Sequence, residues 1–455
     1  MILRNLLYIL QSENYSFPRF LSFCYSHPLW WRLERRQKIV WTPKARALWM
    51  MSIIFFWGAV YAAVLFFGWM MGALFFLFFL VMVPFFVGAA LLALLPCDTF
   101  LKRRKVSRAS TILQASGVRV IGITGSYGKT STKEILAAIL ERGFPVIKTP
   151  ENINTDIGIA DFVIRHATEF AEDKIFIVEM GAHKKGEIRS ICKMVHPEYS
   201  ILIGINEAHL ERFGSLENII SGKFELPLST RKLAILNCDD ENVRQHYQEF
   251  VKVKTICVTE ADAQDVSAKD DFQGFQFDWQ GMRFETALLA RHNITLILLA
   301  ATLAQELGLP LPKIRDAVKE IKPIPHRLEP ICNPATDIMV IDDSYNGNIN
   351  GVISGIGLLG RAKGRKVVLT PGLVELGTES KRAHRRIGEL YAQKADLVLL
   401  IKSQATPYII EGLKQYAFTD YTVYNTTEEA HQDLSRVLRS GDTIIFQNDL
   451  TDNYF

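Results

Sequence analysis

The stretch Val118-Arg-Val-Ile-Gly-Ile-Thr-Gly-Ser-Tyr-Gly-Lys-Thr-Ser-Thr132 predicts the fold of this chain. Its β-branched start, residues 118–123, is typical of a buried strand. Gly125-Ser-Tyr-Gly128 then predicts a turn, and a helical pattern begins at Lys129. A strand, a glycine turn and a helix in this order form a phosphate cradle, because free amides and the helix N-terminus face the anion. We therefore expect a nucleotide triphosphate site, although Ile123 stands where the strict loop pattern requires glycine.

Length and composition limit the classes of protein to consider. The chain has 455 residues, enough for two or three domains with their own cores. A formal net charge of +4 does not indicate a nucleic-acid partner, because the basic residues gather around one apolar stretch. The cysteines form no C-x-x-C pair, so we expect buried or free thiols in a reducing compartment. They are Cys24, Cys97, Cys192, Cys238, Cys257 and Cys332.

An uncharged apolar run extends from Ala47 to Cys97. One membrane-spanning helix needs about 20 apolar residues, so the run is long enough for two helices with a turn at residues 68–72. Basic residues flank both ends, which places both ends in the cytosol. We predict a two-helix transmembrane hairpin at residues 47–97, two-pass in the cytoplasmic (inner) membrane, with the catalytic domains on the cytosolic side. One long tilted helix is the alternative.

Residues 1–46 mix apolar and aromatic side chains with arginines, a composition typical of the lipid headgroup interface. A small helical domain is the alternative interpretation of this region. Residues 98–117 are predicted to form a basic linker. Membrane lipid is therefore an expected partner.

From Val118 onward, strand and helix patterns alternate, which is typical of parallel α/β domains. The stretch 252–290 is expected to be a short β excursion. The proline-rich segment Lys322–Pro330 separates a predicted central domain (118–328) from a C-terminal domain (329–455). The expected strands are 174–178, 199–205, 233–236, 338–341, 366–370, 396–401 and 443–446.

Two side chains, Glu179 and His209, are candidates for ligand binding from their place in the sequence. Glu179 ends a buried strand, at the sheet edge where ligands bind, so we expect it to hold Mg²⁺; capping the next helix is the alternative. His209 follows the next strand, and we favour a ligand role at the same edge over a structural one. Lys223, judged from its helix alone, is expected to be an exposed cation.

Several motifs, in one order, resemble those of the Mur ligase family. The resemblance implies a P-loop central ATP-binding domain and a Rossmann-like C-terminal domain, preceded here by the transmembrane hairpin. The motifs are Gly122-Ile-Thr-Gly-Ser-Tyr-Gly-Lys-Thr130, Asn152-Ile-Asn-Thr-Asp-Ile-Gly158, Glu179-Met-Gly-Ala182, Ala208-His-Leu-Glu-Arg-Phe-Gly-Ser215, Arg291-His-Asn293, His326-Arg327, Asp342-Asp-Ser-Tyr-Asn346, and Glu375-Leu-Gly377 with Ser380 and His384.

The resemblance also implies a reaction. Members of this family are ATP-dependent amide ligases, in which a substrate carboxylate becomes an acyl phosphate that an amine then displaces. The motifs are most similar to the branch that adds D-Ala-D-Ala to a UDP-linked peptidoglycan precursor. We therefore expect a membrane-anchored ligase of cell-wall synthesis, acting on a peptidoglycan precursor and a D-Ala-D-Ala-like amine.

The roles of individual residues follow from the resemblance alone. The cofactors implied are ATP and two Mg²⁺ ions, with Lys223 carbamylated. Catalytic roles fall on Lys129, Lys223, His209 and Glu179. ATP contacts fall on Gly125, Ser126, Tyr127, Gly128, Lys129, Thr130, Ser131, Asn293, Arg327 and Asp343. Metal ligation falls on Thr130, Glu179, His209 and Lys223, and substrate contacts fall on Asn152, Asn154, Asn346 and His384.

Three features depart from the family pattern. The hairpin stands in place of the usual UDP-binding domain, Leu296 replaces an asparagine of the family's H-N-x-x-N pattern, and the C-terminus lacks the usual basic ending. One alternative is a Mur-like ligase of another polymer, such as poly-γ-glutamate. Another is a catalytically inactive nucleotide-binding scaffold whose partners are other cell-wall enzymes, although retention of Lys129, Glu179, His209 and Lys223 argues against it.

Overall fold

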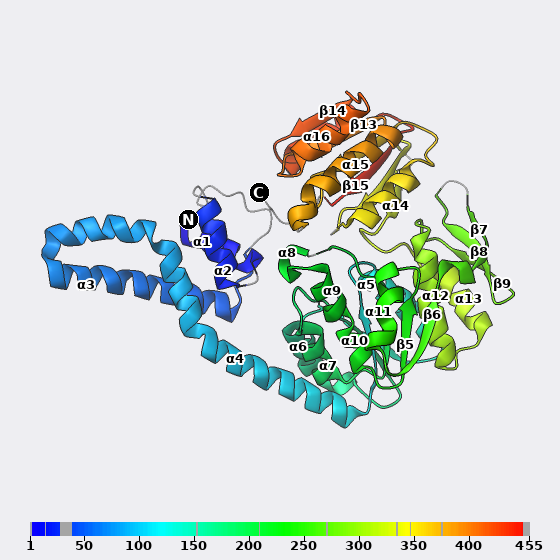
Figure 1. The fold of residues 1–455 in the computed structure, drawn as a ribbon, viewed down its shortest axis with the longest axis horizontal. Helices are drawn as coiled ribbons and strands as arrows, with labels where there is room; N and C mark the ends of the chain where they lie inside the picture. The colour runs from blue at the N-terminus through cyan, green and yellow to red at the C-terminus, as the bar shows by residue number, and fades with distance from the viewer. Residues whose placement is uncertain are drawn as a thin grey trace. The chain divides into compact units, whose positions relative to one another are not determined.

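The chain divides between Arg104 and Lys105 into two compact units. The computed structural model describes residues 2–13, 15–27, 39–151, 153–208, 210–269, 272–333, 335–345, 347–374 and 376–448 (Figure 1).

The N-terminal unit contains α1 (Ile2–Ser12), α2 (Phe17–Ser26), α3 (Pro43–Val81) and the beginning of α4 (Val83–Ser116). Within the described residues, α1 and α2 bury one apolar face against the two long helices. Buried side chains of all four helices form one cluster, which includes Leu6, Leu10, Phe20, Leu48, Val87 and Leu91. Residues 2–26 therefore form part of a packed helical unit.

The apolar helices form a hairpin, as predicted, and its turn lies inside α3. Gly68 adopts φ +77°, a conformation that glycine takes without strain, and it interrupts the helical backbone of α3. The chain then doubles back (Figure 1). The ring of Phe56 lies 5.8 Å from that of Phe76. At the open end, Lys44 Nζ lies 2.8 Å from Asp98 Oδ2. By length and apolar composition, Pro43–Trp69 and Val83–Ser116 could each cross a membrane.

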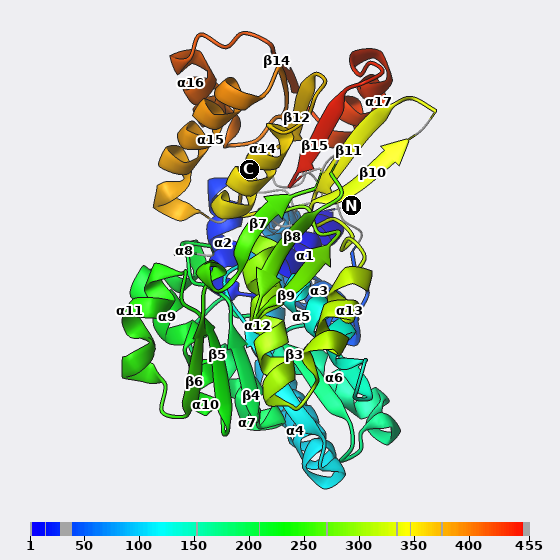
Figure 2. The same cartoon turned by 90° about the vertical axis from the view of Figure 1, so that its right-hand side faces the viewer.

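The central domain contains a six-stranded parallel sheet of order β2-β3-β1-β4-β5-β6 (Figure 2). The carboxyl ends of parallel strands share one edge, so residues that follow β1, β3, β4 and β5 are brought together. The bounds are β1 Arg119–Thr124, β2 Val146–Lys148, β3 Ile175–Glu179, β4 Tyr199–Leu202, β5 Leu233–Asn237 and β6 Lys254–Val258.

Helices cover both faces of this sheet, because successive side chains of each strand point to opposite faces. One face packs against α5 (Lys129–Leu140), α12 (His292–Glu306) and α13 (Leu311–Glu320). The other face includes Ala109 and Leu113 of α4 in its core. The other helices on this second face are α6 Asp156–Arg165, α7 Glu187–Val195, α9 Leu216–Lys223, α10 Glu225–Ser229 and α11 Glu241–Phe250. The domain also contains three short helical segments, η2 Ala167–Glu169, α8 Leu210–Phe213 and η3 Glu260–Asp262.

The predicted β excursion is smaller than the stretch 252–290. Its first strand, β6, instead pairs in parallel with β5 and forms the edge of the central sheet. The remaining strands form a separate antiparallel sheet, whose alternating aromatic residues pack on the α12 and α13 side. They are β7 Gln264–Ala268, β8 Phe275–Trp279 and β9 Met282–Thr286.

The C-terminal domain has the expected Rossmann-like architecture, with sheet order β10-β11-β15-β12-β13-β14. β10 pairs antiparallel to β11, while the other pairs are parallel. The strands are β10 Glu329–Asn333, β11 Ile338–Asp343, β12 Lys366–Thr370, β13 Leu397–Ile401, β14 Tyr421–Tyr424 and β15 Thr443–Gln447. The helices are α14 Ile349–Leu359, η4 Gly377–Glu379, α15 Ser380–Lys394, α16 Thr406–Gln415 and α17 Thr427–Val437.

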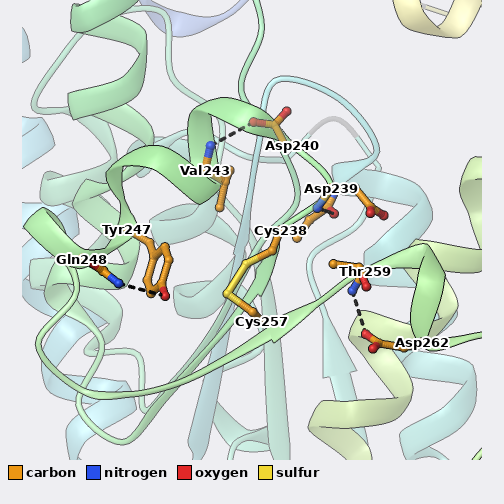
Figure 3. The surroundings of a disulfide bond; sticks show 10 residues. Cys238, Asp239, Asp240, Val243, Tyr247, Gln248, Cys257, Thr259 and Asp262 are labelled. Atoms are coloured by element: carbon orange, nitrogen blue, oxygen red, sulfur yellow. Dashed lines mark hydrogen bonds between the residues drawn. A yellow bond between two sulfur atoms is a disulfide. The ribbon is translucent and has the colours of Figure 1, made fainter.

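The cysteines differ from the expectation of thiols alone. Cys238 and Cys257 form a disulfide, whereas Cys24, Cys97, Cys192 and Cys332 are free (Figure 3). The reason lies in the strand register, which the sequence pattern does not show. Leu236 of β5 pairs with Cys257 of β6, so Cys238, just beyond the end of β5, lies beside that strand.

Helices α15 and α16 cross at glycines, and a side chain there should separate them. A Cβ atom at Gly388 would clash with the carbonyl oxygen of Ile409. We predict that Gly388→Val weakens the local stability of these helices by about 3 kcal/mol, as overpacking does, measured by hydrogen exchange of their amides. Gly357→Ala is the control, since a Cβ there has no neighbour within 4 Å. Unchanged exchange in Gly388→Val would contradict the close crossing.

Candidate active site

The turn after β1 is the predicted phosphate loop. Gly128 takes φ +70° at the start of α5, a conformation that favours glycine. The loop is anchored to the chain that follows β4, since Ser126 N–H donates to Gly204 O at 2.8 Å and Asn206 N–H donates to Ser126 Oγ at 3.2 Å. The strand, turn and helix thus present backbone amides and a helix N-terminus at the sheet edge.

Lys129 bends back over this loop. Its Nζ donates to Gly125 O at 2.9 Å. Burial lowers the pKa of Lys129, with Glu179 acting to raise it and Arg327 to lower it. These three charged groups therefore lie near one another, although they come from different segments of the chain.

Glu179 is the buried carboxylate of the site, with 3% of its surface exposed. Thr130 Oγ1 donates to its Oε2 at 3.0 Å, and Asn154 Nδ2 donates to its Oε1 at 3.2 Å. It does not cap the following helix, whose N-cap residue is Gly186. A hydroxyl and a carboxylate oxygen side by side are the ligands that Mg²⁺ prefers, so Thr130 and Glu179 fit that ion.

Lys133 was not anticipated from the sequence. It lies one helical turn beyond Lys129 and is fully buried, with Nζ 3.4 Å from Glu179 Oε2 and 3.6 Å from Glu134 Oε1. The available signal was its i+4 spacing from Lys129, which places both lysines on one side of α5. Lys133 therefore places a positive charge beside the buried carboxylate of Glu179, as a buried ionisable group requires.

The expectation that Lys223 is exposed was wrong. Only 1% of its surface is accessible, because the face of α9 that carries it turns into the domain core, and its Nζ lies 5.9 Å from the ring centroid of Phe213. Burial lowers the pKa of Lys223 well below its usual value, Lys129 lowers it further, and Glu187 opposes the shift. The site therefore favours a neutral amine at Lys223.

The start of the C-terminal domain contributes charge to the same region. The guanidinium of Arg327 lies 4.4 Å from the ring centroid of Tyr345. Burial lowers the pKa of Arg327, while Asp343 and, more weakly, Glu179 raise it. Burial also raises the pKa of Asp343 to about 8, with Arg327 opposing the shift. Arg327 thus links the C-terminal domain electrostatically to the central carboxylate.

The first turn of α12 lies on the same side of the central domain. Asn293 is buried there, and Thr295 Oγ1 donates to Asp239 Oδ2 at 3.2 Å. Leu296, which departs from the family pattern, is also buried; its methyl groups lie 3.4–3.5 Å from the position of a Cβ on Gly128. Leu296 therefore supports the phosphate loop by apolar packing.

Of the residues expected to contact the substrate, the structure describes Asn154 and His384. Asn154 is held against Glu179, and its carbonyl oxygen accepts from Gly181 N–H at 2.8 Å. His384 is fully buried: its Nε2 accepts from Leu373 N–H at 2.9 Å and its Nδ1 lies 2.7 Å from Ser380 O. With both ring nitrogens engaged, His384 positions the loop after β12. His209, Asn152 and Asn346 lie outside the described residues.

No group of three or more His, Cys, Asp or Glu side chains within the described ranges could hold a metal ion. The predicted set of metal ligands includes His209, which is not one of the described residues.

Lys133 gives a direct test of this arrangement. Lys133→Met should lower the free energy of unfolding of the central domain by about 3 kcal/mol, because it leaves a buried carboxylate without its counter-charge. Hydrogen exchange of α5 and β3 measures the loss. Lys193→Met, at an exposed position of α7, is the matched control. Equal exchange in the two variants would show that Glu179 does not depend on Lys133.

Comparison with known proteins follows the same domain division. Residues 123–304 match the Mur ligase middle domain, and residues 326–447 match the Mur ligase, glutamate ligase domain. The chain is 32% identical over 315 residues to the UDP-N-acetylmuramoyl-tripeptide–D-alanyl-D-alanine ligase of Escherichia coli, covering 65% of this chain and 67% of that protein. It is 27% identical to the Bacillus subtilis ligase of the same name, covering 77% of each.

Solved structures share the fold. MurF from Acinetobacter baumannii has a TM-score of 0.67 at 23% identity, covering 77% of this chain and 78% of that one. MurF from Thermotoga maritima in complex with ADP has a TM-score of 0.67 at 24% identity, covering 77% and 80%. The chain covers 63% of the related Buchnera aphidicola ligase and 62% of that from Mycobacterium tuberculosis, slightly less than two thirds of each.

Proposed function

The chain belongs to the Mur ligase family of ATP-dependent ligases, and from that premise we propose that it joins D-Ala-D-Ala, or a similar amine, to the peptide carboxylate of a peptidoglycan precursor. The observation that carries the proposal is the contact network at Glu179 beside the phosphate loop, where Thr130 Oγ1 donates to Glu179 Oε2 at 3.0 Å and Lys133 Nζ lies 3.4 Å from the same oxygen. Relatives from Escherichia coli and Bacillus subtilis are named for this acceptor and this amine.

The reaction needs charge neutralisation more than covalent chemistry from the protein. A carboxylate oxygen of the precursor attacks the γ-phosphorus of ATP, ADP leaves, and an acyl phosphate forms. The amine nitrogen then attacks the acyl carbon, inorganic phosphate leaves, and the nitrogen loses its proton. Lys129, Arg327 and the amides of residues 125–131 stabilise the transferring phosphoryl group.

We assign the metal and nucleotide contacts as follows. Thr130 and Glu179 would hold Mg²⁺, with His209 as a further ligand, and the ion would neutralise charge on the phosphates. Asn293 and Asp343 would contact the nucleoside. Asn152, Asn154 and Asn346 would face the substrates, while His384 would act by positioning its loop. Ser126, Tyr127 and Ser131 belong to the phosphate cradle.

Lys223 is proposed to be carbamylated. Only a neutral amine attacks CO₂, and burial with the neighbouring charge of Lys129 lowers the pKa of Lys223 in the required direction. The carbamate would then carry a negative charge in a region where Lys129 is a cation. It would supply an oxygen ligand for a second Mg²⁺.

Phosphate release by the solubilised full chain tests the activity. With Mg²⁺, ATP, cell-wall tripeptide precursor and D-Ala-D-Ala, the native protein should release phosphate and form the amide. Lys223→Ala should reduce the rate by about a thousandfold, since a site that stabilises developing charge is lost. Lys193→Met should retain the native rate.

Two results would contradict this proposal. Stimulation only by glutamate oligomers would favour a ligase of poly-γ-glutamate, and nucleotide binding without turnover would favour the scaffold. Unchanged amide formation in Lys223→Ala would exclude the carbamate role.

We also propose that the N-terminal unit anchors the enzyme in the cytoplasmic membrane. Large apolar side chains of the hairpin point outward, with Phe66 83% and Trp69 84% exposed, which is costly in water and favourable in lipid. Lys44 and Asp98 pair at the open end, and a basic run of residues 102–105 follows. Positive residues at both ends place both on the cytosolic side, where ATP is available.

Membrane extraction tests the anchor. The full chain should remain in the membrane pellet at alkaline pH and dissolve only in detergent. A chain that begins at Lys105 should be soluble and still bind ATP, because it keeps Ala109 and Leu113 in the central core. Release of the full chain at alkaline pH would contradict a membrane-spanning hairpin.

A further inference from the structure

The Cys238–Cys257 disulfide joins a buried residue to an exposed one. Cys238, just beyond the end of β5, is buried, whereas Cys257 of β6 is exposed; Figure 3 shows the bond that joins them. The ladder between the two strands continues beside it, and Cys238 N–H donates to Val258 O at 2.9 Å. Reduction would therefore remove one cross-link and leave the strand pairing in place.

The residue two positions after Cys238 holds the phosphate loop. Tyr127 OH donates to Asp240 Oδ2 at 3.2 Å, and Ile205 N–H donates to the same oxygen at 3.0 Å. The other oxygen, Asp240 Oδ1, accepts from Val243 N–H at 3.0 Å at the start of α11 (Figure 3). Asp240 thus connects the phosphate loop to the segment that the disulfide fixes.

Asp239, which lies between Cys238 and Asp240, binds the segments that carry Glu260 and Thr295. Asp239 Oδ2 accepts from Glu260 N–H at 2.7 Å and from Thr295 Oγ1 at 3.2 Å. Thr295 lies two residues beyond Asn293, the proposed nucleoside contact. Residues 238–240 therefore link β6, α12 and the phosphate loop, and the disulfide ties the first of these residues to β6.

We propose that Cys238 and Cys257 form a reversible thiol–disulfide site that sets the affinity of the enzyme for ATP. The inference rests on the proposed nucleotide site. In the oxidised form the segment 238–240 is fixed before ATP binds. In the reduced form it is freer, so ATP binding must also order it, which lowers affinity.

The reductant is a small thiol of the glutathione class. Its thiolate attacks the sulfur of Cys257, the exposed residue of the pair; the S–S bond breaks, and Cys238 leaves as a thiolate that takes up a proton. A second thiol then attacks the mixed disulfide, frees Cys257 as a thiol and yields the oxidised small disulfide. Two electrons and two protons pass from the small thiols to the protein. In reducing compartments disulfides are commonly redox-sensing, which fits this role.

Equilibrium binding of ATP with Mg²⁺ to the detergent-solubilised full chain tests the proposal. Each sample is first oxidised with glutathione disulfide, which accepts the two electrons in the reverse exchange, or reduced with glutathione. The state of each cysteine is established by mass spectrometry of alkylated peptides. The oxidised protein should bind ATP about fivefold more tightly than the reduced protein, as expected when a loop is ordered in advance.

Cys257→Ser should bind ATP like the reduced native protein under both treatments, and Cys257→Ala should behave the same way if the exposed position tolerates either residue. Cys332→Ser is the matched control, since Cys332 is free and exposed in the C-terminal domain, and it should retain the fivefold response.

Equal ATP affinity in both redox states, or a failure of Cys238 and Cys257 to pair on oxidation, would overturn the inference while leaving the proposed function intact. Absence of ATP binding in either state would contradict the proposed function itself, and this inference with it.

Discussion

The carboxylate of Glu179 is buried at the end of β3, and a buried charge persists only when it is paired and hydrogen-bonded. Its partners come from separate segments: Thr130 and Lys133 from α5, and Asn154 from the segment before α6. Satisfying this one group therefore fixes the first turns of α5 against β3. The phosphate loop at the start of α5 is positioned by the same contacts.

Several cations act around the carboxylate of Glu179, with Glu134 beside Lys133 and Asp343 acting on Arg327. Lys129, Lys133 and Arg327 all act on it, and Arg327 belongs to the segment that begins the C-terminal domain. Fixed cations suit a region that receives polyphosphate, because they stabilise developing negative charge without rearrangement. Burial and the charge of Lys129 also lower the pKa of Lys223 well below its usual value.

Much of the fold and part of the site could be predicted from the sequence. The phosphate loop, Glu179 at a strand end and the reversal at Gly68 depend on neighbours in the chain, so local patterns reveal them. The roles of Asn293 and Asp343 came only from resemblance to a family. The structure shows where these two residues lie, while their roles stay predictions.

The sequence by itself indicated most of the central strands and the phosphate-loop turn, because hydrophobic period and glycine placement act within a few residues. It did not indicate β2, β10 or β14. Tertiary structure alone decided the burial of Lys223 and Lys133, since only packing shows which helix face meets the core. Only the tertiary structure shows that both ring nitrogens of His384 have backbone partners and that Cys238 and Cys257 form a disulfide. These outcomes depend on contacts between residues distant along the chain, or on strand register, which no local pattern encodes.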